Sequence, residues 1–326
     1  FAEAGFRVVA VDMDHHLTNL LKKNTDSSIN FTLNKLVKEH LESEKLTMTS
    51  NIRETTSRSD VIILSVQPLI GRKKKPDYSK VERACKEVGM GVRSGCLVIV
   101  ASTTGPGVTE SLVKETLENA SGLKAGVNFG LAYSPFYVES EIFTENSATH
   151  QLVVGAINEE SVRIACLILG TLTKDLLIVR DMKTAEAIRL LRDVYHDLNV
   201  AFANELASYC EKARIDFIEV QRAAGERLHC YIPTPKIVTE EQMKALYLLL
   251  EEAEAIDTKL PLLTLTRKAN DEMLRHVLRL VRDALQACNK PVRRAKISIL
   301  GVSHKPNIKE FRGSITKKLV RMMNKK

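Results

Sequence analysis

The chain of 326 residues has no tryptophan, and aromatic residues make up only 5% of it. Nucleic acid is disfavoured as a partner, because aromatic residues are few and no recognition motif appears. No apolar run reaches the roughly 18 residues that span a bilayer, and no secretory signal opens the chain. We therefore expect neither a nucleic-acid nor a membrane partner.

Paired cysteine motifs are also missing. None of the cysteines has CxxC spacing, and most lie within apolar helical or strand patterns, at Cys85, Cys96, Cys166, Cys210, Cys230 and Cys288. This usage suits a reducing, cytoplasmic location better than a disulfide framework or a zinc site. We predict no bound metal.

Acidic residues are fewer than basic ones, 40 against 48, so the formal net charge is +8. Basic residues are spread along helical patterns, with clusters only at 71–76 and at the C-terminal end. A small molecule that carries phosphate is sufficient to use a positive cleft on such a protein.

Short β-branched runs alternate with helical patterns over residues 1–181. Buried strands separated by helices form βαβ units, so this region is predicted to be a Rossmann-like, doubly wound α/β domain. The expected strands lie at 7–14, 60–66, 96–103, 128–135, 151–156 and 175–180.

A long helix is predicted between Thr184 and Lys212. Apolar residues recur there at spacings of three and four, at Ile188, Leu191, Tyr195, Leu198, Phe202, Leu206 and Tyr209. At about 1.5 Å per residue this helix would extend roughly 43 Å, long enough to bridge two domains or to form a dimer interface. Further helices are expected at 214–224, 239–256 and 261–288, so residues 182–290 are predicted to be an all-helical central domain.

Residues 291–326 contain too few predicted helices and strands to form a domain. One strand at 296–302 and one helix near 313–324 are predicted there. A single strand and a single helix cannot bury a core, so we expect these residues to begin a further domain that the chain does not complete. The first residue is Phe1 rather than methionine, and we expect the natural protein to begin upstream.

Three stretches carry a family resemblance: LNVAFANELASYCEKARID at 198–216, RKANDEM at 267–273 and GVSHKPNIKEFRGS at 301–314. Together they resemble the nucleotide-sugar 6-dehydrogenases, which oxidise UDP-sugars to uronic acids with NAD. HDLNVAFANEL and KPNI are most similar to the branch that acts on UDP-N-acetylmannosamine. The resemblance implies an NAD-binding Rossmann domain at 1–181, a helical domain at 182–290 that forms a homodimer through 184–212, and the start of a Rossmann-like UDP-sugar domain at 291–326.

By the same resemblance, residues 1–6 match the end of the helix that follows the family's glycine-rich phosphate loop. The first strand is then absent from the sequence, and a gap is expected at the centre of the sheet. Asp12 matches the acid that binds the adenosine ribose and favours NAD over NADP, although a solvated strand-end acid is the alternative. Ser102 and Thr103 match the family's pair at the nicotinamide end, although such residues also cap helices.

Oxidising an alcohol to an acid takes two hydride transfers, and the family holds the aldehyde stage on a cysteine as a thiohemiacetal and then a thioester. Cys230 matches this nucleophile, and His229 beside it is expected to contact the substrate. Arg189 and Asp193 replace the family's lysine and asparagine on the central helix, with a mutual salt bridge as the alternative. Arginine stabilises an oxyanion but cannot transfer a proton, so Asp193 would act as the base.

The resemblance also assigns two cations in the last loop. Lys305 is expected to contact the UDP-sugar and Arg312 the cofactor, although a solvated loop would also carry such residues. Lys309 and Glu310 stand where the family has an acidic pair, which raises the positive charge there.

Several other family positions are changed. Phe136 stands where the family has a glutamate, Thr234 falls at an aspartate, and Arg227 and Leu228 replace loop glycines. The changes at Arg189, Asp193, Phe136 and Thr234 favour a second hypothesis, a catalytically degenerate member that binds nucleotide or serves as a dimerisation partner. A two-domain dehydrogenase of 3-hydroxy acids is a third interpretation, but it leaves the 301–314 loop unexplained.

Overall fold

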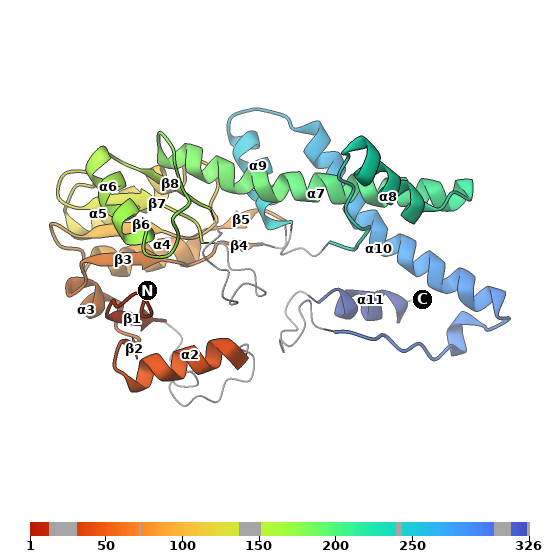
Figure 1. Cartoon of the computed structure of the whole chain (residues 1–326), viewed down its shortest axis with the longest axis horizontal. Helices are drawn as coiled ribbons and strands as arrows, with labels where there is room; N and C mark the ends of the chain where they lie inside the picture. The colour runs from red at the N-terminus through yellow and green to blue at the C-terminus, as the bar shows by residue number, and fades with distance from the viewer. Residues whose placement is uncertain (13–30, 72, 137–150, 239–242, 303–313, 325–326) are drawn as a thin grey trace. The chain divides into compact units, whose positions relative to one another are not determined.

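The computed structural model describes residues 1–12, 31–71, 73–136, 151–238, 243–302 and 314–324. It divides into two compact units, the first covering Phe1–Leu190 and the second beginning at Leu191. The described strands belong to the first unit, whereas the second is helical (Figure 1). The domain boundaries expected near residues 181 and 290 stay predictions.

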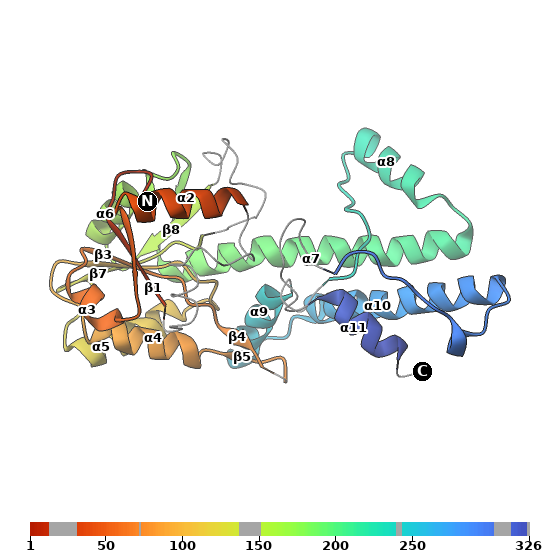
Figure 2. The same cartoon turned by 90° about the horizontal axis from the view of Figure 1, so that it is seen from below.

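The main sheet of the first unit has the order β3–β6–β7–β8–β9. Its strands are Val61–Leu64, Leu97–Val100, Gly130–Tyr133, Leu152–Ala156 and Leu176–Ile178. All neighbours are parallel except β7 and β8. Val98 and Val100 pack on the side of α4 (Ser79–Gly89) and α5 (Lys114–Ser121), whereas Leu97 and Ile99 pack on the side of α6 (Glu159–Leu169). Helices thus cover both faces (Figure 2), which is why these strands are continuous apolar runs.

A separate parallel pair precedes this sheet. It consists of β1 (Val8–Val11) and β2 (Leu46–Thr49), with α2 (Phe31–Glu42) and α3 (Ile52–Ser57) on either side of β2 in the chain. Among the described residues, neither strand pairs with β3, so the expected gap in the sheet is present. The short, half-polar β2 was not predicted. A small antiparallel hairpin, β4 (Leu69–Ile70) and β5 (Pro76–Asp77), follows β3.

The predicted long helix is confirmed as α7 (Met182–Ala213). Gly155 of β8 lets the chain enter this helix, because a Cβ there would clash with the backbone carbonyl of Asp181. The buried face of α7 is not the predicted apolar one. Most of its members are small or polar; they are Met182, Ala185, Glu186, Leu190, Val194, Asp197, Val200, Ala201, Ala203, Asn204 and Cys210. The predicted stripe instead leaves its largest side chains exposed.

The other helices of the central region are also confirmed, as α8 (Phe217–Leu228), α9 (Lys244–Ala255) and α10 (Pro261–Ala287). Asp216 begins α8 as an N-cap whose carboxylate accepts from the N–H groups of Ile218 and Glu219. The terminal helix is α11 (Ile315–Met323), after a short 3₁₀ turn, η3 (Val292–Arg294). The strand predicted at 296–302 was wrong. These residues form no strand, because within the described part of the chain their apolar run has no neighbouring strand to pair with.

Within the described ranges, the longest helices remain too polar to qualify as bilayer spans. The same part of the chain contains no group of three His, Cys, Asp or Glu side chains placed to hold a metal ion.

Candidate active site

The predicted cofactor residues Ser102 and Thr103 follow β6, at the carboxyl end of the main sheet. The Ser102 side chain is buried, and its hydroxyl donates to the carbonyls of Leu64 at 3.2 Å and Val66 at 2.7 Å. This hydroxyl therefore ties the ends of β3 and β6 together. Thr103 is half-exposed, and its N–H donates to Gln67 Oε1 at 3.1 Å. Of the pair, Thr103 presents the surface that a cofactor could contact.

Asp12 directly follows β1, and its side chain is exposed. Its N–H donates to the carbonyl of Thr49 at 3.3 Å, which holds the residue at the end of the β1–β2 pair. An exposed carboxylate at the carboxyl end of a parallel strand fits the ribose end of a dinucleotide. Thr103 and Asp12 would hold NAD, which supplies the hydride acceptor when bound.

The loop after β6 is fastened by a residue that the sequence did not reveal, Glu186 on α7. Its carboxylate is fully buried and accepts from Thr104 Oγ1 at 2.9 Å, Thr109 N–H at 2.9 Å and Thr109 Oγ1 at 2.6 Å. The N–H of Gly107 is a fourth donor. Burial raises the pKa of Glu186, and these hydrogen bonds oppose that rise. No local pattern marks a single acid on a helix as the anchor of a distant loop.

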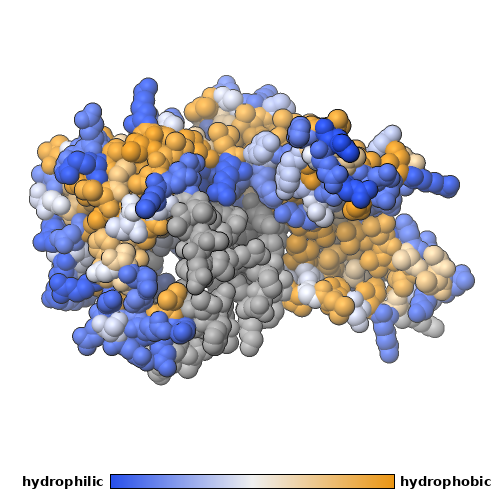
Figure 3. Space-filling model, in the orientation of Figure 1, coloured by the Kyte–Doolittle hydropathy of each residue, from blue (hydrophilic) through white to orange (hydrophobic). Residues whose placement is uncertain are grey.

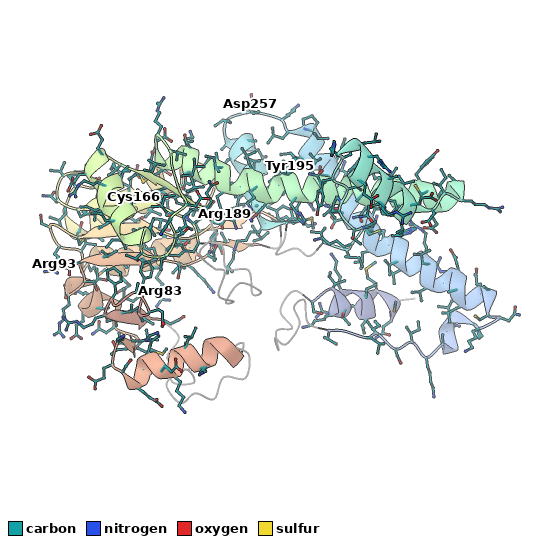
Figure 4. The ribbon with its side chains drawn as sticks, in the orientation of Figure 1. Arg83, Arg93, Cys166, Arg189, Tyr195 and Asp257 are labelled. Atoms are coloured by element: carbon teal, nitrogen blue, oxygen red, sulfur yellow. The ribbon has the colours of Figure 1, made fainter. Side chains whose placement is uncertain are left out.

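Arg189 lies one turn after Glu186 on α7 (Figure 4). It is close enough to the buried phenol of Tyr133 for their charges to interact. Burial is the main cause that raises the pKa of Tyr133; the negative charge of Glu186 adds to the rise, and Arg189 opposes it. Glu186 and Arg189 thus both act on the phenol of Tyr133, with opposite signs.

Two carboxylates follow on the next turns of α7. Asp193 is half-buried, and Asp197, four residues later, is only 2% exposed. Burial raises the pKa of Asp197 to about 7; the charge of Asp193 adds to the rise, and Lys236 opposes it. Asp197 therefore holds a proton through much of the range below neutrality. The sequence did not single it out, because i and i+4 acids are common on exposed helices.

Cys230, the predicted nucleophile, lies just beyond α8 and is exposed. His229 ends that helix in the left-handed conformation, with φ of 55°. The N–H of Cys230 donates to the carbonyl of Ala224 at 3.0 Å. Thr234, further along the same loop, is also exposed.

Four of the other five cysteines are buried or partly buried, which makes them less suited to act as nucleophiles. Burial raises the pKa of Cys85 to about 12, and it also raises the pKa of Cys96 and Cys166. Cys210 is buried as well, which leaves Cys230 and Cys288 as the exposed thiols. Since the thiolate is the reactive form, accessibility favours Cys230 over the buried thiols.

Of the remaining predicted residues, two lie outside the residues that the structure describes, and one packs against another aromatic ring. Lys305 and Arg312 lie outside the described residues. Phe136 packs near Phe1, with ring centroids 6.2 Å apart, so it serves in packing at the position where the family has a glutamate.

A doubly wound unit that matches a family NAD binding domain, followed by a helical unit, defines the class, an NAD-dependent oxidoreductase. The chain belongs to the UDP-glucose/GDP-mannose dehydrogenase family. The model of the family's NAD binding domain matches residues 1–172, and that of its central domain matches residues 183–272. The predicted family, the predicted fold class and NAD as cofactor are thereby confirmed. This membership makes the chain an NAD-dependent nucleotide-sugar dehydrogenase.

Several known proteins are similar to it. A UDP-N-acetyl-D-mannosamine dehydrogenase from Pyrococcus horikoshii is 29% identical over 99% of this chain and 76% of its own length. Protein CapL from Staphylococcus aureus is 28% identical over 94% of this chain and 72% of its own. A solved UDP-D-ManNAc dehydrogenase structure from P. horikoshii superposes with a TM-score of 0.91 at 28% identity, covering 99% of this chain and 77% of that one.

Proposed function

We propose that the protein oxidises the C6 alcohol of a UDP-sugar, UDP-N-acetylmannosamine, to the uronic acid. The observation that carries this proposal is the exposed Cys230 at the end of α8, in a chain that matches both family domains. The similar sequence and the similar solved structure from P. horikoshii are both named as a dehydrogenase of UDP-N-acetylmannosamine, which supports that sugar.

The proposed reaction assigns a role to each predicted residue. Asp193 takes the proton of the C6 hydroxyl as hydride leaves to NAD, and the Cys230 thiolate adds to the resulting aldehyde. A second hydride transfer, to a second NAD, converts the thiohemiacetal to a thioester, and water then releases the carboxylate and the thiol. Arg189 stabilises the oxyanion of these intermediates, since its guanidinium keeps its charge. His229 contacts the sugar beside Cys230, and Lys305 and Arg312 contact phosphates of substrate and cofactor.

NADH formation from NAD and UDP-N-acetylmannosamine tests this function in the full gene product. GDP-mannose and UDP-N-acetylglucosamine serve as competing substrates, and a higher kcat/KM for either would overturn the assigned sugar. The variant Asp193→Asn is expected to lower kcat by about 100-fold, the usual contribution of a general base. Because asparagine is the family's residue at this position, faster turnover in Asp193→Asn would contradict the role of Asp193.

The second candidate is a family member that binds nucleotides but has lost its catalytic activity. Arg189 favours it, because arginine cannot transfer a proton as the family's lysine can. Calorimetric binding of NAD and UDP-sugar without any NADH formation would establish it instead of the dehydrogenase.

We also propose a homodimer through α7. Tyr195 and Phe202 on this helix are large aromatic side chains, yet they are 67% and 54% exposed. Leu191 and Tyr209 continue the same stripe at 54% and 62%. The surface drawn in Figure 3 likewise shows broad apolar areas over the helical unit.

Replacing Tyr195 and Phe202 by glutamate is expected to convert the dimer to monomers. Each charge would weaken association by about tenfold or more, because it would be buried without a partner in the dimer. Sedimentation velocity at several concentrations measures the change. Leu167→Glu on α6, where the side chain is 63% exposed, is the matched control and should leave the dimer intact. A wild-type protein that is monomeric at high concentration would contradict the proposal.

A further inference from the structure

Two buried amides join three separate elements of the helical unit. Asn204 of α7 is 3% exposed and Asn270 of α10 is 1% exposed. Asn204 Oδ1 accepts from the N–H of Lys236 at 2.9 Å, and Asn204 Nδ2 donates to the carbonyl of the same residue at 3.0 Å. The side chain thus pairs with both polar backbone groups of one residue, as a neighbouring strand would.

Asn270 completes this arrangement, which we call the amide clasp (Asn204, Asn270 and the backbone of Lys236). Asn204 Nδ2 also donates to Asn270 Oδ1 at 3.1 Å, and Asn270 Nδ2 donates to the carbonyl of Asp197 at 3.1 Å. Both amide hydrogens of Asn204 therefore have acceptors. A buried polar network that is satisfied in this way specifies a single arrangement of the segments that it joins.

The clasp lies at one end of the loop that carries Cys230. At the other end, the N–H of Cys230 is held by the carbonyl of Ala224 at 3.0 Å. Between them, Gln221 Nε2 of α8 donates to the carbonyl of Ile232 at 2.9 Å. Within the six residues that follow Cys230, the backbone is therefore hydrogen-bonded to side chains at Ile232 and at Lys236. An extended chain of six residues spans at most about 20 Å, so these bonds limit how far the loop can move.

We propose that Asn204 and Asn270 are positioning residues that fix the Cys230 loop against α7 and α10. They act through the backbone of Lys236 and need not touch the substrate. The consequence for catalysis rests on the proposed function, in which Cys230 must reach the C6 carbon. A displacement of about 1 Å in such a group can reduce the rate by about 100-fold.

Hydrogen exchange of residues 230–238 in the full gene product, without substrate or cofactor, tests the clasp itself. In Asn204→Asp one carboxylate oxygen still accepts from Lys236, but the other faces the Lys236 carbonyl and Asn270 Oδ1. Exchange in this loop is expected to become at least about tenfold faster. Asn199→Asp is the matched control, because Asn199 lies on the same helix and donates only to the carbonyl of Tyr195, at 2.7 Å, among its hydrogen bonds in the described chain.

A second pair of variants leaves α7 and α10 unchanged. Lys236→Pro removes the N–H that donates to Asn204. Lys236→Ala keeps that N–H and removes the side chain, including its 3.1 Å contact with His196 Nε2, so it measures the side chain's own contribution. Faster exchange in Asn204→Asp and Lys236→Pro, with both controls like the wild type, supports the clasp. Unchanged exchange in Lys236→Pro and Asn204→Asp overturns it.

Turnover then separates positioning from simple support of the fold. We expect Asn204→Asp to lower kcat by at least about tenfold while KM for NAD stays unchanged. Faster exchange with unchanged kcat would overturn the positioning role. A wild type that forms no NADH would refute the proposed function, and the exchange results would still decide the clasp.

Discussion

Uronic acid formation is expected to fall by about 1,000-fold or more when Cys230 is replaced by alanine, since removal of a covalent nucleophile costs factors of this size or larger. Without the thiol, the aldehyde from the first oxidation cannot become a thiohemiacetal, so the second hydride transfer has no proper substrate. The ratio of NADH formed to sugar consumed should therefore decline from two toward one.

Mass spectrometry of acid-quenched turnover mixtures gives the second readout. The wild type should show a sugar acyl adduct on the peptide that contains Cys230, and Cys230→Ala should show none. Cys288→Ala is the matched control, because Cys288 is also exposed. Full turnover in Cys230→Ala would place the covalent chemistry on another residue, or remove it from the mechanism.

Replacing Glu186 by glutamine is expected to lower the free energy of unfolding by about 3 kcal/mol, the scale of disrupting a buried, hydrogen-bonded charge. The wild-type carboxylate has four donors around it, from Thr104, Gly107 and Thr109. An amide supplies a single oxygen and turns two hydrogens of its own toward those donors. The loop after Ser102 would therefore lose its anchor on α7.

Denaturant unfolding compares this variant with Glu205→Gln, the same change at an exposed position of the same helix. The control should differ from the wild type by at most about 0.5 kcal/mol. If Glu186→Gln were as stable as the wild type, the cost of burying the Glu186 charge would equal the free energy that its hydrogen bonds contribute, and the prediction would be wrong.

Two residues of the proposed reaction replace the family's own. Arg189 and Asp193 lie on α7 as the spacing predicted, and the structure adds Asp197, whose pKa near 7 follows mainly from burial. The charge of Asp193 adds to the burial that raises the pKa of Asp197. A neutral asparagine at position 193 would not make this contribution.

The sequence by itself determined the features that repeat locally. β-Branched runs predicted the strands of the main sheet, spacings of three and four predicted α7, and short motifs around Asn204 and Asn270 carried the family resemblance. Among the described residues, β1 and β2 pair with each other and neither pairs with β3, in line with the gap that the sequence led us to expect. These features depend on neighbours in the chain, which a sequence displays directly.

Only the tertiary structure decided which groups meet. Glu186 binds Thr104 across 82 residues, and Asn204 binds Asn270 across 66. The apolar periodicity of α7 predicted the helix but not which of its faces is buried, and the large side chains of the stripe at Leu191, Tyr195, Phe202 and Tyr209 are exposed. The run at 296–302 has strand character but no strand beside it. A hydrogen bond or a buried face requires a partner in space, and periodicity along one segment does not specify that partner.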